Sequence, residues 1–414
     1  MIMLNEMHLV FFCHIIRPYE QPLGGSGDDL GGKMNKGALD GITVLDMSRL
    51  LPGPYASMIL ADHGARVIVI EDRRFAAESL IDGGVNRNKE HMTLNLKSEA
   101  GRDVFFKLAA SADVVLEGFR PGVTKRLGVD YDAVSKVNPA IVYCSISGYG
   151  QTGSYRDVAG HDVNYLSVSG VLDLIGEAGG PPVIPGIQIA DMAGGGMNAV
   201  MGILMALVAR QNTGKGQYID ISMTDGCFSL LTLAFIMQQM TGQAPKRADF
   251  LFSHRYACYN IYETKDGRYL SIGAVENRFW KILCEFFGVP EYIEHQYNDA
   301  RRQEIIDYFR GRFKTETFAY WEEALADKDV CWAPVRTMSE AVDSPLFKSR
   351  EMIAEIETPG KKPIKVLGTP IKLSRTPGGV RTAPPGFGQD THRILKETGY
   401  SDSDIERLEK AGAV

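Results

Sequence analysis

One histidine and one aspartate in this sequence stand in segments that suit proton transfer. His161 belongs to the segment GHDVNYL (160–166), and Asp191 belongs to IADMAGGG (189–196). A histidine side chain exchanges a proton near neutral pH, so it can act as a general acid or a general base. Asp191 is predicted at the start of a long apolar helix, where free N–H groups and the helix dipole favour an anion. Taken one at a time, a buried histidine and an ordinary helix-capping aspartate explain these residues at least as well.

The cysteines and the glycine motifs argue against a metal centre or a bound redox cofactor. The six cysteines form no C-x-x-C pair and are irregularly spaced, which is typical of free thiols in a reducing compartment. No G-x-G-x-x-G follows the first predicted strand, where LPGP (51–54) stands instead, and no P-loop occurs. We therefore expect no metal and no cofactor.

Length and charge predict a soluble globular protein. The chain has 414 residues, 44% of them hydrophobic and 23% charged, with a net charge of −6. Without an overall positive charge, neither nucleic acid nor an anionic membrane is an expected partner. No apolar run approaches the length of a membrane span. Residues 1–33 lack the basic start of a secretory signal and end in a Gly- and Asp-rich stretch, so we predict a disordered extension and a cytoplasmic location.

The elements that must position His161 and Asp191 follow an alternating strand–helix order. A β-branched strand at 41–46 precedes a helix within 50–62 and a second strand at 65–71. A helix at 99–112 and two strands at 114–117 and 141–146 continue the pattern. This order predicts an α/β fold with a Rossmann-like parallel sheet.

The pattern of predicted elements changes after about residue 255. A long apolar helix (192–210) and a strand (218–221) precede a hairpin pattern at 256–273, three amphipathic helices within 277–326 and a polar helix at 390–411. We predict a smaller α+β domain here. The predicted divisions, in chain order, are an extension (1–33), a large Rossmann-like domain (34–230), a linker (231–255), a small domain (256–345), and a linker with a C-terminal return to the large domain (346–414).

Taken together, the motifs resemble a known family. GHDVNYL, ADMAGGG and TGKGQ (213–217) are similar to the core of the α-methylacyl-CoA racemase branch of the family III (CaiB–BaiF type) CoA-transferases. PGPY (52–55), GFRPG (118–122) and SGYGQ (147–151) extend the resemblance. It implies an acyl-CoA substrate whose CoA is not a separate cofactor, an interlocked homodimer, and His161 and Asp191 as two acid/base residues. It also implies that Glu276, in IGAVENRF (272–279), hydrogen-bonds the catalytic histidine.

The chemistry of a thioester explains a need for two such residues. The α-proton of an acyl-CoA is acidic because sulfur is a poor resonance donor to the carbonyl. Inverting the α-carbon requires one group to remove the proton from one face and another to deliver a proton to the opposite face. Asp191 is expected to be ionised, and the N–H groups beside it are candidate donors to the enolate oxygen.

The resemblance also assigns residues to the CoA moiety. The segment 94–97 resembles the strand that lines the adenine pocket, and arginine suits phosphate. The predicted CoA-binding residues are Arg73, Leu94, Asn95, Leu96, Lys97, Arg120 and Tyr165. Four methionines (192, 197, 201 and 205) lie on or near the predicted long helix, and the default interpretation is that they belong to a buried core helix. The alternative is that they form a wall along which the acyl chain of the substrate moves.

One departure from the pattern leaves the reaction open. Where racemases of this type carry Gly-Gly-Ala-Pro, this chain has Ser253-His254-Arg255-Tyr256, and Arg255 could pair with an anionic acyl group. The main alternative is a CoA-transferase, in which Asp191 attacks the thioester and carries CoA to a carboxylic acid. A non-catalytic acyl-CoA-binding subunit is a third possibility. His161 favours the racemase, as does the lack of a glycine-run lid after residue 225.

Overall fold

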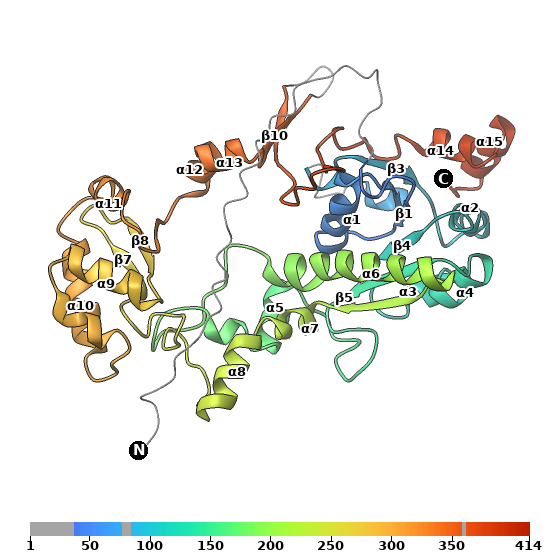
Figure 1. The fold of residues 1–414 in the computed structure, drawn as a ribbon. Helices are drawn as coiled ribbons and strands as arrows, with labels where there is room; N and C mark the ends of the chain where they lie inside the picture. Colours follow the sequence, from blue (N-terminus) through green and yellow to red (C-terminus); the bar gives the residue numbers. More distant parts are fainter. Residues whose placement is uncertain (1–36, 77–83, 358–361) are drawn as a thin grey trace. The chain divides into compact units, whose positions relative to one another are not determined.

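A six-stranded parallel sheet organises the first half of the chain. The computed structural model describes residues 37–76, 84–357 and 362–414, so the predicted extension 1–33 lies outside the described residues. The sheet order is β3-β2-β1-β4-β5-β6, and every neighbouring pair is parallel (Figure 1). The strands are β1 (Thr43–Asp46), β2 (Arg66–Glu71), β3 (Lys89–Thr93), β4 (Val114–Glu117), β5 (Val142–Ser147) and β6 (Tyr218–Ser222).

This strand order creates a switch point at the centre of the sheet. From β1 the chain adds strands outward on one side through β2 and β3, and then returns to place β4 on the other side of β1. Open α/β sheets bind ligands beyond the carboxyl ends of the strands at such a reversal. The predicted Rossmann-like α/β class is therefore confirmed, and its geometry indicates where a ligand site is to be expected.

Both faces of the four central strands are largely buried, which explains why β2, β1, β4 and β5 are mostly apolar. Val44, Val67 and Val114 pack on one face with side chains of α1 and α6. Leu45 and Ile68 pack on the other face with α2, α14 and α15. The helices of this part are α1 (Pro52–Asp62), α2 (Glu99–Ala109), α3 (Val123–Leu127), α4 (Tyr131–Val137), α5 (Asp162–Val168), α6 (Asn198–Thr213), α7 (Met223–Ser229) and α8 (Thr232–Thr241).

The long helix predicted at 192–210 begins as a π-helix. The wider turn runs over Ala190–Met197 (η4) and continues without a break into α6, which ends before Gly214 in the left-handed conformation (φ +68°). Among the described residues, Ala190–Thr213 is one helical stretch long and apolar enough to cross a membrane. The expectation that no apolar run approaches that length was therefore wrong. Ala199, Ile203 and Ala206 of this helix are fully or almost fully buried against the sheet.

A second, smaller core follows in the chain. The strands β7 (Tyr259–Glu263), β8 (Tyr269–Gly273) and β9 (Trp332–Pro334) form an antiparallel sheet. The helices α9 (Asn277–Phe286), α10 (Arg302–Phe313) and α11 (Phe318–Leu325) pack Trp280, Phe309 and Trp321 onto it. The predicted hairpin and the three amphipathic helices are all present, with ends shifted by a few residues.

The C-terminal segment packs against one face of the parallel sheet. The single polar helix expected at 390–411 is two helices, α14 (Thr391–Glu397) and α15 (Asp402–Lys410), because Gly399 (φ +89°) turns the chain between them. Ile394, Ile405 and Val414 join the core on the α2 face of the sheet. The remaining elements, in chain order, are η1 (Arg73–Phe75), η2 (Gly84–Asn86), η3 (Leu172–Leu174), η5 (Pro290–His295), α12 (Met338–Asp343), α13 (Pro345–Ser349), β10 (Ile353–Ile356) and β11 (Ile364–Leu367).

Candidate active site

His161 stands at the entrance of a short helix beyond the carboxyl end of β5. It is the residue before α5, with an extended backbone (φ −131°, ψ 178°). Its backbone N–H donates to Asn164 Oδ1 at 3.0 Å, and its carbonyl accepts the Asn164 N–H at 2.8 Å. The backbone is therefore fixed by the helix cap, while the imidazole stays exposed to solvent.

Asp191 lies close to His161, in the first turn of the π-helix. Burial, together with the nearby Asp162 carboxylate, raises the pKa of Asp191 to about 6, and His161 partly opposes this rise. Asp191 is therefore still mostly ionised at neutral pH, as expected from the sequence, but burial and a second carboxylate make it hold a proton more readily than an exposed aspartate does. With a pKa near 6, roughly one Asp191 carboxyl in ten carries a proton at pH 7. Asp191 is thus able to give a proton as well as to take one.

Asp162 holds Asp191 in place and was not singled out from the sequence. Its Oδ1 accepts the backbone N–H of Asp191 at 3.0 Å. The N–H of Met192 donates to the carbonyl of Gln188 at 3.0 Å. The N–H groups of Asp191 and Met192, which are among those beside Asp191 that could stabilise an enolate, are therefore already bonded within the chain.

The glycine run after Asp191 lets the π-helix lie against two other helices. A Cβ at Gly196 would lie 2.8 Å from the Tyr55 ring and 3.0 Å from the Pro52 carbonyl oxygen, both in α1. A Cβ at Gly194 would lie 2.6 Å from the carbonyl oxygen of Met223, in α7. Any side chain larger than hydrogen would force these elements apart, so the glycines position Asp191.

Tyr165 lies within electrostatic range of both Asp191 and the predicted CoA-binding residue Arg120. Burial, together with the Asp191 carboxylate, raises the pKa of Tyr165 to about 12, and Arg120 partly opposes this rise. Its hydroxyl donates to the Gly160 carbonyl at 2.5 Å, and its ring packs edge-to-face on Tyr149 at 5.2 Å. Tyr165 therefore neighbours both groups, with its hydroxyl already bonded.

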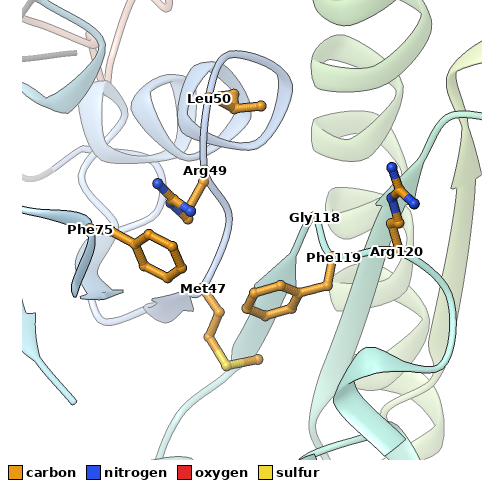
Figure 2. Close-up of a pocket in the computed structure, with 7 residues that line it drawn as sticks. All are labelled: Met47, Arg49, Leu50, Phe75, Gly118, Phe119 and Arg120. Carbon is orange, nitrogen blue, oxygen red and sulfur yellow. The ribbon is translucent and has the colours of Figure 1, made fainter. Parts of the chain in front are cut away.

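A cavity of about 610 Å³ opens at the switch point of the sheet. Figure 2 shows the residues that line it, which follow β1, β2 and β4: Met47, Arg49, Leu50, Phe75, Gly118, Phe119 and Arg120. The guanidinium carbon of Arg49 lies 3.5 Å from the centroid of the Phe75 ring. Two cationic side chains and several apolar walls are suited to a ligand that carries both phosphate and a flat ring.

The other residues predicted to bind CoA do not line this cavity. Arg73 is exposed on η1, and Lys97 is exposed before α2. Leu94 and Leu96 are buried in the core. The Asn95 side chain donates to the Gly412 carbonyl at 3.1 Å, so the C-terminal tail covers this segment. Of the predicted set, the structure brings Arg120 to the cavity and Tyr165 beside Asp191.

Glu276 and Arg255 have other neighbours. Glu276 precedes α9 and acts electrostatically on Tyr297 and Cys331; no hydrogen bond joins it to His161 within the described part of the chain. Its role as a partner of His161 stays a prediction. Arg255 forms ion pairs with Asp249 at 3.1 Å and with Asp299 at 2.9 Å. Both carboxylates compete with any anionic acyl group for this guanidinium.

The methionine-rich helix differs from its default interpretation. Met197, Met201 and Met205 expose 43%, 48% and 69% of their surface, and Met192 is half-buried. They are not a core helix face. The helix is apolar on every side, so its sequence period could not reveal which side faces the sheet.

Comparison with known proteins identifies the family. Residues 39–391 match the sequence model of CoA-transferase family III. The chain belongs to this family. It is 34% identical over 374 residues to α-methylacyl-CoA racemase of Homo sapiens, covering 90% of this chain and 96% of the racemase. It is 32% identical over 398 residues to succinyl-CoA:glutarate CoA-transferase of Homo sapiens, covering 91% and 90% of the two chains.

A solved structure agrees with the sequence relatives. The crystal structure of a CAIB/BAIF family protein from Brucella suis superimposes with a TM-score of 0.77 and 28% identity, over 88% of this chain and 100% of that one. Family III members are CoA-utilising enzymes that act as racemases or as transferases. Because the two kinds of relative are almost equally similar, identity does not choose between the two reactions.

Proposed function

We propose that this protein is an acyl-CoA racemase that inverts the α-carbon of a 2-methyl-branched acyl-CoA. The observation that carries the proposal is the pairing of His161 with Asp191, whose carboxyl has a pKa of about 6. A two-base reaction needs each group to be an acid in one direction and a base in the other. An aspartate of ordinary pKa would rarely hold the proton that it must deliver.

Each proton in the proposed reaction has a named donor and a named acceptor. Neutral His161 removes the α-proton from one face and becomes an imidazolium, and the thioester becomes an enolate. Protonated Asp191 then delivers its proton to the opposite face and becomes a carboxylate. The reverse reaction starts from the imidazolium and the carboxylate. No metal or separate cofactor takes part in this proposal, because one side chain accepts the α-proton and another supplies its replacement.

The CoA moiety is proposed to bind at the switch-point cavity. Arg120 lines that cavity and acts electrostatically on Tyr165, which in turn neighbours Asp191. A CoA moiety held there has its thioester end directed toward Tyr165 and Asp191. This arrangement separates the recognition of CoA from the proton chemistry, which is a common division in α/β enzymes.

The second candidate function is CoA transfer to a carboxylic acid. Asp191 would attack the thioester carbonyl, the C–S bond would break, and the departing CoA thiolate would then displace the first acid from the mixed anhydride. The acceptor acid would complete the exchange by the same steps in reverse. The transferase among the relatives at 32% identity favours this candidate. It leaves His161 without a role in the chemistry.

One assay separates the two functions. Wild-type protein is incubated with a single enantiomer of a 2-methylacyl-CoA in deuterium oxide, with and without an acceptor acid. We expect inversion with α-deuterium in both samples. No deuterium in any branched substrate, together with transfer of CoA to the acid, would replace the racemase with the transferase.

We also propose that the protein works as a cytoplasmic homodimer. Large apolar side chains are exposed along α6, α7 and α8, including Met205 (69%), Phe228 (62%) and Phe235 (56%). Monomeric proteins rarely leave such a patch uncovered, and two-fold assembly is the commonest solution. Light scattering at micromolar concentration tests this: a mass of about twice 45.6 kDa is expected, and a monomeric mass would refute it.

A further inference from the structure

A second cavity lies in the smaller core, between the strand β7 and the helix α10. Its volume is about 690 Å³, which is a size typical of small-molecule sites. The strand side is formed by Asn260, Ile261 and Glu263 of β7, the edge strand of the antiparallel sheet. Among the described residues, this cavity and the switch-point cavity share no lining residue. The proposed reaction therefore leaves this cavity without a role.

One side of α10 carries a row of cations along this cavity. Arg302, Arg310 and Lys314 are separated by eight and four residues, so they lie on the same side of the helix. The two outer cations of the row are paired with acids of the cavity. Arg302 lies 2.5 Å from Asp249, and Lys314 lies 2.8 Å from Glu263. The central cation, Arg310, is bonded differently.

Arg310 has its ion-pair partner outside the cavity lining. That partner is Asp307 at 3.3 Å, on the same helix, and both side chains are more than half exposed. Exposed pairs of this kind contribute little, so a ligand can replace Asp307 at small cost. The charged side chains that line the cavity are four cations and three carboxylates: Arg255, Arg302, Arg310, Lys314, Glu177, Asp249 and Glu263. One positive charge is left to be balanced by a ligand.

His254 is held at this cavity in a costly backbone conformation. Its φ of +62° lies in the left-handed region, as does the φ of +51° at Ala248, which also lines the cavity. The N–H of His254 donates to the Tyr259 carbonyl at 3.2 Å, and the carbonyl of His254 accepts the Asn260 side-chain amide at 3.1 Å. Such strain persists only where the surroundings hold it, and it is common where a protein grips a ligand.

The imidazole of His254 responds to the charge beside it. Burial and then the positive charge of Arg310 lower the pKa of His254 below its ordinary value of 6.5, so the ring is neutral at pH 7. Of the seven charged side chains that line the cavity, Arg310 is the one whose charge contributes to this shift. An anion bound beside Arg310 would offset that charge and raise the pKa of His254. Anion binding is therefore expected to be coupled to proton uptake.

We propose that this cavity is a second ligand site, which binds a small organic oxyanion, either a carboxylate or a phosphate monoester, through Arg310 and His254. Guanidinium and imidazole groups both donate to such oxygens. Gln303 and Tyr269 place further polar groups at the walls, and the volume leaves room for a carbon skeleton. The site gives His254 of the segment 253–256 a function that does not depend on the reaction catalysed.

Calorimetric titration of simple anions tests the site. Succinate, glycerol 3-phosphate and uncharged glycerol are titrated separately into the wild-type protein, Arg310→Ala and Arg312→Ala. Arg312 is the matched control because it lies on the same helix, with its guanidinium 5.7 Å from the Phe287 ring, outside the lining of the described cavity. We expect at least one anion to bind the wild type. Its affinity should fall about tenfold or more in Arg310→Ala and change less than about twofold in Arg312→Ala.

The same titrations decide which anion the site prefers and whether it exists. Tighter binding of succinate identifies a carboxylate ligand, and tighter binding of glycerol 3-phosphate identifies a phosphate monoester. Binding of neither anion to the wild type overturns the proposal. Equal losses in Arg310→Ala and Arg312→Ala overturn it as well, because they show a general effect of surface charge.

Arg120→Ala separates this site from the switch-point cavity, which a phosphate could also enter. Arg120 lines that cavity, so anion affinity should be unchanged in Arg120→Ala if the anion binds between β7 and α10. A loss in Arg120→Ala with none in Arg310→Ala would place the anion at the switch point and overturn the proposal. The titrations need no turnover, so their outcome does not depend on whether the protein is a racemase.

His254→Asn tests the imidazole while keeping the backbone, because asparagine tolerates the left-handed region. The heat of succinate binding at about pH 6 is measured in two buffers of different ionisation enthalpy, which gives the number of protons taken up. We expect greater proton uptake in the wild type than in His254→Asn. Equal uptake in the two proteins would show that His254 does not face the bound anion and would overturn its part in the site.

Discussion

The carboxylate of Asp162 accepts the backbone N–H of Asp191 at 3.0 Å, so one acidic side chain holds the turn that carries the other. The same carboxylate repels a proton-free Asp191 and helps to raise the pKa of Asp191 to about 6. The Asp162 carboxylate therefore influences both the position of Asp191 and its affinity for a proton. Asp162 is the residue directly after His161 in the sequence.

Asp162→Asn should separate the two effects of Asp162. The amide keeps an oxygen that can accept the Asp191 N–H, but it removes the negative charge, so the pKa of Asp191 should fall toward its ordinary value of 3.8. In the direction in which Asp191 is the acid, the rate declines as pH rises through that pKa. We expect this decline in kcat/KM to move to lower pH in Asp162→Asn, and the activity at pH 7 to fall in that direction. An unchanged pH profile would contradict the electrostatic role.

Asp191→Asn should stabilise the folded protein at neutral and alkaline pH. A carboxyl whose folded pKa is raised binds its proton more tightly in the folded state, so its contribution to stability is complete below about pH 4 and is lost as pH rises through about 6. A rise in pKa from 3.8 to about 6 sets an upper limit near 3 kcal/mol on this contribution, and partial exposure of Asp191 reduces the expected gain to about 1 kcal/mol. Thermal unfolding at pH 5 and pH 8 measures it. A higher Tm for the variant at pH 8, with a smaller difference at pH 5, is the expected pattern.

Gly196→Ala should disturb the packing of the π-helix against α1. The new methyl group would lie 2.8 Å from the Tyr55 ring and 3.0 Å from a backbone oxygen, and overpacking of this kind costs about 1–3 kcal/mol. Because η4 carries Asp191, kcat should fall together with Tm. Gly186→Ala is the matched control, since a Cβ there meets no atom within 4 Å and the residue is not in the left-handed region. Equal behaviour of the two variants would mean that the glycine run does not position Asp191.

The sequence predicted the parts of this molecule that depend on local pattern. The strands 65–71 and 114–117 are apolar and β-branched, and they appear as β2 and β4. The long helix that carries Asp191 in its first turn was expected from an apolar run that Thr213 and Gly214 end. Where two motifs flank one site, such as His161 and Asp191, the family resemblance supplied the connection that spacing alone could not.

The contacts that the sequence did not predict join residues that are distant in the chain. Arg49, Glu71 and His91 lie after or within three different strands, and only the order β3-β2-β1 brings them together. Asp162 and Asp191 are 29 residues apart. The exposure of Met201 and Met205 depends on which side of a uniformly apolar helix meets the sheet. None of these relationships produces a periodic pattern in the sequence from which it could have been predicted.

The two acid/base residues should give different isotope patterns when each is removed. If His161 and Asp191 serve opposite faces of the α-carbon, His161→Ala stops inversion but leaves exchange of one enantiomer with solvent through Asp191. Asp191→Ala leaves exchange of the other enantiomer through His161. Each loss of inversion should be on the order of a hundred- to ten-thousand-fold.

A nucleophilic Asp191 predicts an unequal outcome for the same two variants. Asp191→Ala then abolishes all activity, while His161→Ala retains most of the CoA transfer, and hydroxylamine traps the activated Asp191 in the wild type and in His161→Ala. Deuterium at the α-carbon, followed by mass spectrometry for each enantiomer and each variant, distinguishes the two cases. Asp191→Asn is the additional control, because it keeps the volume of the side chain and removes both the base and the nucleophile. If the two bases lie on opposite faces, one alanine variant exchanges only one enantiomer and the other variant exchanges only its mirror image. A single shared nucleophile does not make either variant selective for one enantiomer, so this complementary pattern is produced only by opposed bases.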